Sequence, residues 1–268
     1  MGELGVAIGG FGAVGREVAK ALIGGLPGLR LGAVSGRDRA KARAGLAELG
    51  SDVPVLPLED LAANAEIVLE CLPAEAFRLV AEPAIEQGRI FMPLSVGQLL
   101  AHGDLVERAA ATGARILPPT GALLGLDAVR AAAEGRIERV AMVTRKPPGG
   151  LAGAPHLVHN GISLDGLEEP LLVFRGSARE GARGFPANVN VAAALSLAGI
   201  GPDRTTLEIW ADPGVGRNVH LITVEADSAR FEMRIENVPS ANPKTGRITA
   251  LSTIAALRGL TATLKVGS

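Results

Sequence analysis

The sequence predicts an α/β protein with two parts: a doubly wound parallel sheet, and an α+β region whose sheet is mostly antiparallel. Two observations predict this. Apolar strands and helical patterns alternate up to about residue 117, and strand then follows strand from Ile137 onward. Alternation is typical of parallel sheets covered by helices, whereas runs of strands indicate antiparallel sheets. Because 268 residues are comfortable for two domains, we expect one in residues 1–120 and 242–268 and the other in residues 121–241.

The composition is that of a globular protein with nearly balanced charge. Hydrophobic residues make up 47% of the chain and charged residues 21%, and the net charge is −1. This balance offers no general attraction to nucleic acid or to anionic membranes. The chain starts without a basic leader, and no apolar run reaches the ~20 residues of a membrane span. We therefore expect a soluble, cytoplasmic protein with no nucleic acid and no membrane partner.

The first strand leads into a glycine-rich turn. Leu4–Ile8 is a short apolar run, Gly10, Gly12 and Gly15 form G-x-G-x-x-G, and Ala13–Ile23 has a helical apolar pattern. This order is typical of a Rossmann-type dinucleotide site, in which the pyrophosphate lies at the amino end of the helix. The contacts expected there are Gly10, Phe11, Gly12, Ala13 and Val14. A glycine-rich turn without a ligand is the alternative, since the chain has 35 glycines.

The second strand, Leu29–Val34, ends where such domains choose between NAD and NADP. An NAD-selective site usually has a carboxylate at this point, whereas arginine accommodates the 2′-phosphate of NADP. The tip offers Ser35 with Arg37 close behind, which permits either cofactor. Two alternatives stay open: the arginine is simply solvated at a helix start, and Asp38 turns inward or caps that helix.

The remaining elements of the first domain continue the alternation. After a helix ending at Leu49, we expect strands and helices at Val53–Leu56, Leu58–Ala63, Ile67–Leu72, Ala74–Gln87, Arg89–Ser95, Val96–Thr112 and Ala114–Leu117. Ligands bind at the carboxyl ends of parallel strands, so Cys71, Leu72 and Pro73 are expected to border the cofactor. Cys71 is the single cysteine, which excludes an internal disulfide, and we expect a small buried hydrophobe rather than a nucleophile.

The second domain is predicted from a series of strands with one helix. The strands cover Ile137–Lys146, Leu171–Arg175, Leu207–Ala211, Val219–Ala226 and Ala229–Asn237, with a hairpin through Asp227-Ser228 and a helix at Asn188–Ala198. A last helix at Thr245–Leu257 and a strand-like run at Leu260–Val266 are expected to return to the first domain.

Of the four histidines, His220 has the placement most useful for chemistry. It lies near the start of Val219–Ala226, after a glycine loop, and alternation puts it on the apolar face with Ile222 and Val224. It is either a satisfied core histidine or a desolvated general base.

The other histidines predict no metal site. His156 and His159 are spaced as a ligand pair, but the sequence signals no third ligand. His102 has no obvious partner.

Cations and amides supply further candidates for binding. Lys146 ends a strand beside a glycine loop and Lys244 lies in a helix's first turn, so both can hold substrate carboxylates, although surface charge is the alternative. Asn188 suits a helix N-cap and is also a substrate candidate, while the Asn190 amide can bond a nicotinamide carboxamide or cap the helix.

Several motifs in this order give the chain a resemblance to the L-aspartate dehydrogenase family along essentially its whole length. They are I-G-G-F-G-A-V-G (8–15), T-G-A-L-L-G-L-D (120–127), R-K-P-P (145–148), F-P-A-N-V-N-V-A-A (185–193), A-D-P-G-V-G-R-N-V-H (211–220) and N-P-K-T-G (242–246). The resemblance implies that His220 is catalytic, that Asn190 contacts the cofactor, and that Gly121 and Leu124 lie in a further cofactor-binding segment. Leu124 replaces the family's usual alanine. The family is similar in fold to dihydrodipicolinate reductase, whose H-H-x-x-K run this chain lacks.

The resemblance also implies a reaction. It is the NAD(P)-dependent oxidative deamination of L-aspartate to iminoaspartate, which gives oxaloacetate and ammonia, or the reverse amination, with a link to NAD biosynthesis. A base must neutralise the substrate amine, and a histidine suits that role. The family implies a homodimer formed through the second, substrate-binding domain. The alternatives are a reductase for another small dicarboxylate or imine, and a non-catalytic NAD(P)-sensing protein.

Overall fold

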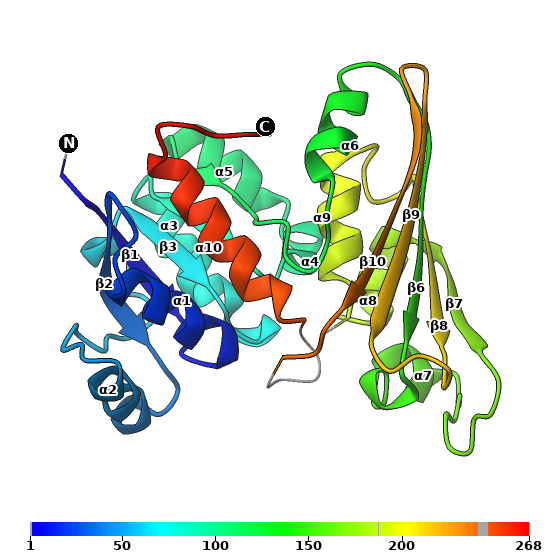
Figure 1. The fold of residues 1–268 in the computed structure, drawn as a ribbon, viewed down its shortest axis with the longest axis horizontal. Coiled ribbons are helices and arrows are strands. Elements are labelled where there is room, and N and C mark those ends of the chain that lie inside the picture. Colours follow the sequence, from blue (N-terminus) through cyan, green and yellow to red (C-terminus); the bar gives the residue numbers. More distant parts are fainter. Residues whose placement is uncertain (1, 187, 241–245, 268) are drawn as a thin grey trace. The chain divides into compact units, whose positions relative to one another are not determined.

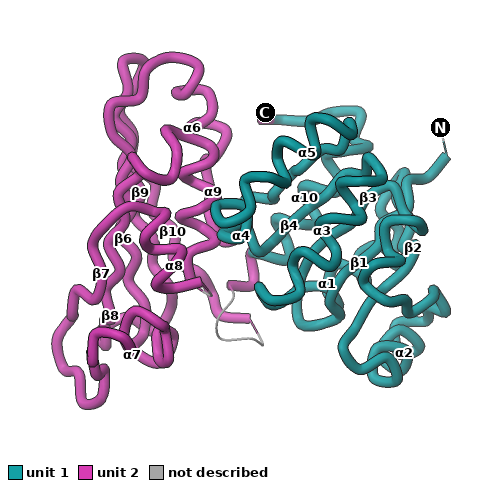
Figure 2. Tube along the Cα trace, turned by 180° about the vertical axis from the view of Figure 1, so that it is seen from behind, with its two compact units in different colours: residues 1–121, 249–266 teal, residues 122–248, 267–268 magenta. Residues whose placement is uncertain are grey.

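The computed structural model describes residues 2–186, 188–240 and 246–267. The chain forms two compact units, shown in different colours in Figure 2. Unit 1 comprises residues 1–121 and 249–266, and unit 2 comprises residues 122–248 and 267–268. The predicted fold class is confirmed: a parallel, doubly wound sheet is accompanied by a second, mostly antiparallel sheet.

Unit 1 is a five-stranded parallel sheet in the order β2-β1-β3-β4-β5. Leu22 of α1 and Leu257 of α10 pack with Ile8 of β1 on one face, while Phe77 of α3 contacts Phe91 of β4 on the other (Figure 1). The elements are β1 (Leu4–Gly9), α1 (Ala13–Ile23), β2 (Leu29–Ser35), α2 (Arg39–Glu48), β3 (Ile67–Glu70), α3 (Phe77–Glu86), β4 (Ile90–Pro93), α4 (Gly97–Ala101), α5 (Asp104–Thr112), β5 (Arg115–Ile116) and α10 (Ile248–Thr261).

Unit 2 is a five-stranded sheet in the order β10-β9-β6-β8-β7, covered by helices on one face (Figure 1). Only the β6–β8 pair is parallel among the described strands of this sheet. The core between sheet and helices includes Met142, Leu195 and Ile222. The elements are α6 (Leu126–Ala133), β6 (Ile137–Lys146), α7 (Pro155–His159), β7 (Leu171–Ser177), α8 (Ala178–Gly184), α9 (Asn190–Ala198), β8 (Thr205–Ala211), β9 (Asn218–Ala226) and β10 (Arg230–Asn237). The predicted hairpin between β9 and β10 is present.

Several predicted elements of unit 1 were wrong. The predicted strand Val53–Leu56 is a single bridge at Val55, because Pro54 and Pro57 have no N–H to donate to a ladder. The predicted helix at 58–63 is only a short 3-10 turn at Ala62–Asn64. The predicted helix at 96–112 is two helices, α4 and α5, separated at His102 and Gly103.

The carboxyl-terminal prediction was also wrong. Residues 260–266 form no strand, since α10 continues to Thr261 and packs Leu257 and Leu260 against the core of unit 1. Its predicted first residue, Thr245, lies outside the described residues. Three helices of unit 2, α6, α7 and α8, were not predicted from the sequence. The available signal for α8 was the capping box that Ser177 and Glu180 form at its start.

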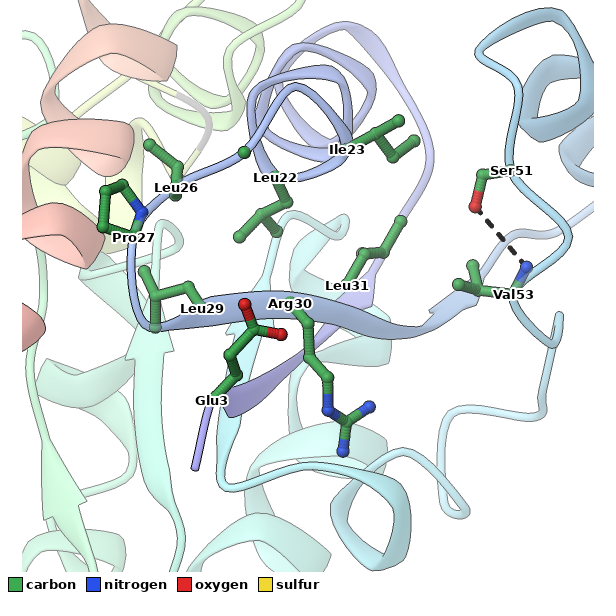
Figure 3. A pocket seen from close by; sticks show the side chains of 11 residues that line it. Glu3, Leu22, Ile23, Leu26, Pro27, Leu29, Arg30, Leu31, Ser51 and Val53 are labelled. Carbon is green, nitrogen blue, oxygen red and sulfur yellow. Dashed lines mark hydrogen bonds between the residues drawn. The ribbon is translucent and has the colours of Figure 1, made fainter. Parts of the chain in front are cut away.

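An open pocket of about 550 Å³ lies beside β2 (Figure 3). It is lined by residues of the α1–β2 connection and of the first half of β2, including Leu26, Leu29 and Leu31, and by Glu3 at the start of the chain. These are the amino ends of the parallel strands, whereas ligands of doubly wound sheets bind at the carboxyl ends. None of the described helices is long and apolar enough to cross a membrane.

Candidate functional site

The glycine turn between β1 and α1 is shaped by two close backbone contacts. Gly10 has φ 102°, and a Cβ there would lie 2.4 Å from the Cys71 carbonyl oxygen. A Cβ on Gly15 would lie 2.0 Å from the carbonyl oxygen of Gly10. Both positions therefore require glycine for the fold itself.

Gly12 differs from the other two glycines because its surroundings are open. A Cβ there would meet nothing within 4 Å. Gly12 is the N-cap of α1, no side chain caps this helix, and its first turn holds no acidic residue. The free N–H groups and the helix dipole favour an anion at this position. The turn thus fits a dinucleotide pyrophosphate, as the G-x-G-x-x-G pattern predicts.

The tip of β2 carries no carboxylate free for a ribose. The Asp38 carboxylate accepts a hydrogen bond from Lys41 N at 3.0 Å and caps α2, which is one of the two roles open to it from the sequence. Ser35 is 5% exposed, and Arg37 is exposed beside it. Phe11 packs against α2, since a Cβ on Gly45 would lie 3.0 Å from its ring.

Glu70 is a buried carboxylate at the carboxyl end of β3 that the sequence analysis did not single out. It accepts hydrogen bonds from Leu72 N at 2.6 Å, Leu94 N at 3.1 Å and Ser95 N at 2.9 Å. The Ser95 hydroxyl lies 2.9 Å from its Oε1. Burial raises the pKa of Glu70, although these hydrogen bonds oppose the shift. Glu70 therefore ties together the turns that follow β3 and β4.

Cys71, Leu72 and Pro73 continue from Glu70 along this edge of unit 1. Burial raises the pKa of the Cys71 thiol well above its ordinary value, and the Glu70 charge adds to the shift. A thiol held protonated is a poor nucleophile. The backbone of Cys71 instead closes the turn, because Cys71 N donates to Gly9 O at 2.7 Å.

A second polar group lies in unit 2, on the helix-covered face of the sheet. β6 and β9 run antiparallel with Thr144 directly opposite His220, and Thr144 Oγ1 lies 3.1 Å from His220 Nδ1. Two residues along β6, Lys146 Nζ donates to Asn188 Oδ1 at 3.0 Å. Thr144, Lys146 and His220 are all at most 4% exposed. We call Thr144, Lys146, Asn188 and His220 the buried polar cluster.

Burial lowers the pKa of both ionisable groups of the buried polar cluster, Lys146 and His220. Burial lowers the pKa of Lys146 to about 8. Burial, and then the charge of Lys146, lower the pKa of His220 to about 3. Within residues 2–186, 188–240 and 246–267, no carboxylate lies within ion-pair distance of Lys146. A buried ammonium without a carboxylate is unfavourable unless an anion binds beside it.

The neighbouring predictions have mixed outcomes. Asn188 is not the N-cap of α9: Val189 is, and the Asn188 side chain faces Lys146 instead. Asn190 is the first residue of α9. Arg145 points to the other face of the sheet, where it pairs with Asp212 at 2.9 Å.

The remaining candidates are not brought into one described site. Lys244 lies outside the described residues. Gly121 belongs to unit 1 and has φ 65°, while Leu124 belongs to unit 2 and is 37% exposed.

His102 and His156 make contacts with side chains of their own units. The sequence indicated no obvious partner for His102, and in the structure its Nδ1 lies 3.2 Å from Arg78 Nη1. His156 packs between the rings of Phe174 and Phe185, at centroid distances of 5.4 and 5.3 Å. Among the described residues, no group of three or more His, Cys, Asp or Glu side chains could hold a metal.

Comparison with known proteins gives the family. The family model "Aspartate dehydrogenase, C-terminal" matches residues 127–260, and "Homoserine dehydrogenase, NAD binding domain" matches residues 10–119. An L-aspartate dehydrogenase of Bradyrhizobium diazoefficiens is 59% identical over 266 residues, covering 99% of this chain and 95% of its own. The chain belongs to the aspartate dehydrogenase family. An L-aspartate dehydrogenase of Bordetella bronchiseptica is 55% identical, covering 99% of this chain and 98% of its own.

Solved structures agree with this family in fold. The aspartate dehydrogenase of Thermotoga maritima superposes with a TM-score of 0.74 at 22% identity, covering 99% of this chain and all of its own. A homoserine dehydrogenase of Thiobacillus denitrificans has a TM-score of 0.63 at 16% identity, covering 97% of this chain and 73% of its own. The predicted membership in the aspartate dehydrogenase family is confirmed, and residues 10–119 match an NAD-binding domain.

Proposed function

We propose that this member of the aspartate dehydrogenase family oxidises L-aspartate to iminoaspartate with NAD or NADP, or catalyses the reverse amination. Water then converts iminoaspartate to oxaloacetate and ammonia, and the imine can also supply NAD biosynthesis. The observation that carries the proposal is the buried polar cluster, in which a neutral imidazole lies on the same face as a buried lysine that has no carboxylate partner among the residues the structure describes.

His220 is proposed as the general base. The substrate amine must lose a proton before its lone pair can form the imine, and the neutral imidazole can accept that proton. With a pKa near 3, the ring of the ligand-free protein is a weak base. An anionic substrate that offsets the charge of Lys146 would raise this pKa, so the imidazole becomes a better base when aspartate is bound.

Lys146 and Asn188 are proposed to hold a substrate carboxylate. A carboxylate beside Lys146 Nζ would replace an unpaired buried charge with an ion pair, which favours binding. Asn188 already orients the ammonium through its Oδ1. Lys244, which the described residues do not include, remains proposed for the second carboxylate.

The glycine turn of unit 1 is proposed to hold the dinucleotide. A bound nicotinamide nucleotide accepts the hydride that leaves the substrate Cα. The open surroundings of Gly12 fit its pyrophosphate, and Arg37 fits a 2′-phosphate. The proposed contacts are Gly10, Phe11, Gly12, Ala13, Val14, Ser35, Arg37, Cys71, Leu72, Pro73, Gly121, Leu124 and Asn190.

A homodimer formed through unit 2 is also proposed. The face of the sheet opposite the helices carries half-buried apolar side chains, among them Val143, Trp210 and Leu221, and no described helix covers it (Figure 1). A second copy placed on this face would bury them in a self-complementary interface. Sedimentation of the wild type and of Leu221→Asp tests this. We expect the mass of a dimer for the wild type and a lower mass for Leu221→Asp, and equal masses for the two proteins would contradict the proposal. A cytoplasmic location, with access to nicotinamide nucleotides and aspartate, belongs to the same proposal.

Aspartate-dependent reduction of NAD and NADP, followed by absorbance of the reduced nicotinamide, tests the function. The panel includes L-aspartate, D-aspartate, L-glutamate, L-malate and L-homoserine. We expect reduction with L-aspartate and at least a hundredfold lower kcat/KM with the others. Preference for another dicarboxylate would support a different dehydrogenase of this fold, and binding of the nucleotide without turnover would support a sensing protein.

A further inference from the structure

Within the buried polar cluster, Thr144 and His220 form a contact of their own across two neighbouring strands. They occupy directly opposed positions of β6 and β9, and their Oγ1 and Nδ1 atoms are 3.1 Å apart. Each residue is only 2% exposed. Water therefore cannot easily replace either partner, and a buried polar group without its partner is expensive.

We infer that Thr144 is a positioning residue for His220: its Oγ1 accepts the Nδ1–H of the ring, which leaves the lone pair on Nε2. This inference rests on the proposed role of His220 as the base. Thr144 would thus act through His220, whereas Lys146 and Asn188 are proposed to contact the substrate itself.

The direction of the hydrogen bond follows from the proton that the ring must take up. A neutral imidazole has one N–H and one lone pair, and after protonation both nitrogens donate. If Nδ1–H donates to Thr144, the same oxygen accepts before and after proton uptake, and nothing has to rotate. If the hydroxyl donated to Nδ1 instead, Nε2 would carry the hydrogen and could not receive the substrate proton.

The surroundings leave Thr144 as the group that selects the tautomer. On the other side of His220, β10 places the apolar Ile235 opposite it. Arg234 and Glu236 lie on the far face of that strand and bond to each other. Lys146 is the one charge that shifts the pKa of His220 within the described part of the chain, and α9 contains no ionisable side chain.

The test compares Thr144→Val, which keeps the shape without the hydroxyl, with Thr144→Ser, which keeps the hydroxyl. Thr223→Val on the opposite face of β9 is the matched control. We expect Thr144→Val to lower kcat by roughly 10- to 100-fold, a fraction of what general-base catalysis supplies. Thr144→Ser should stay within about threefold of wild type, since it keeps the hydroxyl that sets the tautomer. NADH affinity should be unchanged in all three variants.

The second readout is the tautomer itself, observed by ring-¹⁵N NMR of the ligand-free protein, with the His220 signals identified by their loss in His220→Gln. We expect a protonated Nδ1 and an unprotonated Nε2 in the wild type and in Thr144→Ser, and a shifted tautomer in Thr144→Val. A protonated Nε2 in the wild type, or equal kcat values for Thr144→Val and Thr223→Val, would overturn the inference. Full activity of His220→Gln would instead overturn the proposed role of His220 as the base. The tautomer is measured without turnover, so failure of the proposed base and failure of the inference about Thr144 can be distinguished.

Discussion

The glycine turn of unit 1 presents backbone groups and open space, whereas the buried polar cluster of unit 2 presents side chains and almost no surface. Gly12 has no atom within 4 Å of where a Cβ would lie, whereas Lys146 and His220 are 4% and 2% exposed. The turn holds an anion with backbone N–H groups, which nearly every residue type has. The sequence of the turn is therefore constrained only by the space that its side chains may occupy. The cluster needs particular polar side chains held out of water, so its sequence is constrained by charge and hydrogen bonding. Burial of these groups destabilises the ligand-free fold.

This difference predicts opposite effects of mutation on stability and on activity. Substitutions at the close contacts of the glycine turn should damage folding. Removal of the buried charge of Lys146 should damage catalysis while leaving the fold intact or more stable.

Lys146→Met should give the largest change. Loss of the ammonium should lower kcat/KM for aspartate about a thousandfold. This factor corresponds to ~4 kcal/mol, which is typical of a buried charge pair that loses one partner. The same variant should raise the free energy of unfolding at pH 7 by about 1–3 kcal/mol, because the buried charge is gone. Steady-state kinetics and denaturant unfolding measure the two effects, with Lys265→Met on the exposed tail as control.

The gain in stability should depend on pH with a definite sign. The pKa of Lys146 is lowered from 10.5 to about 8, so between these values the unfolded chain binds a proton that the native protein does not. Wild-type stability therefore rises with pH across this window relative to Lys146→Met, and the difference disappears above it. A difference that stays constant from pH 7 to 11 would show that Lys146 carries no buried charge.

Gly15→Ala should give the largest loss of stability. Its Cβ would lie 2.0 Å from a backbone oxygen, so β1 and α1 must move apart, which costs about 3 kcal/mol. Gly12→Ala is the matched control, because its Cβ meets no protein atom. It should leave the melting temperature of the ligand-free protein nearly unchanged and weaken NADH binding about tenfold or more. Equal melting temperatures for the two variants would contradict the steric account.

Glu70→Ala should have an intermediate effect on stability. It removes the acceptor of three backbone N–H groups, and we expect the free energy of unfolding to fall by about 2 kcal/mol. Glu70→Gln, which keeps one acceptor oxygen and the volume, should lose less. Chemical denaturation measures both, and a Glu70→Ala protein as stable as wild type would show that water satisfies these groups.

Arg37→Ala should have the smallest effect, confined to the choice of cofactor. Loss of one charge contact to the 2′-phosphate should lower the ratio of kcat/KM for NADP over NAD about tenfold, or ~1.4 kcal/mol. Arg39→Ala is the comparison variant. If the ratio does not move in either variant, Arg37 is a solvated surface residue, which was the alternative that the sequence left open.

The glycine turn could be predicted from the sequence more fully than the buried polar cluster, because its residues are contiguous in the chain. The glycine turn is contiguous, and each glycine has a local reason that a motif captures. Strand alternation likewise placed His220 on the buried face with Ile222 and Val224, as the structure confirms. The polar partners escaped prediction, because Thr144 meets His220 only through the register of β6 and β9, 76 residues apart.

Two further examples show the same limit. Asn188 looked like an N-cap from its position before a helix, but α9 begins later and the amide bonds Lys146, 42 residues away in the chain. Glu70 is the one charged residue in the apolar run Ile67–Leu72, and its role depends on backbone N–H groups that follow another strand, β4. Local patterns specify elements and faces, whereas partners across a sheet depend on pairing that the patterns do not encode.

The turnover of His220→Ala tests the central claim most directly. We predict that its kcat with L-aspartate falls a hundredfold or more, while NADH affinity remains at the wild-type value. A variant that binds NADH normally and still oxidises aspartate at the wild-type rate would contradict the account.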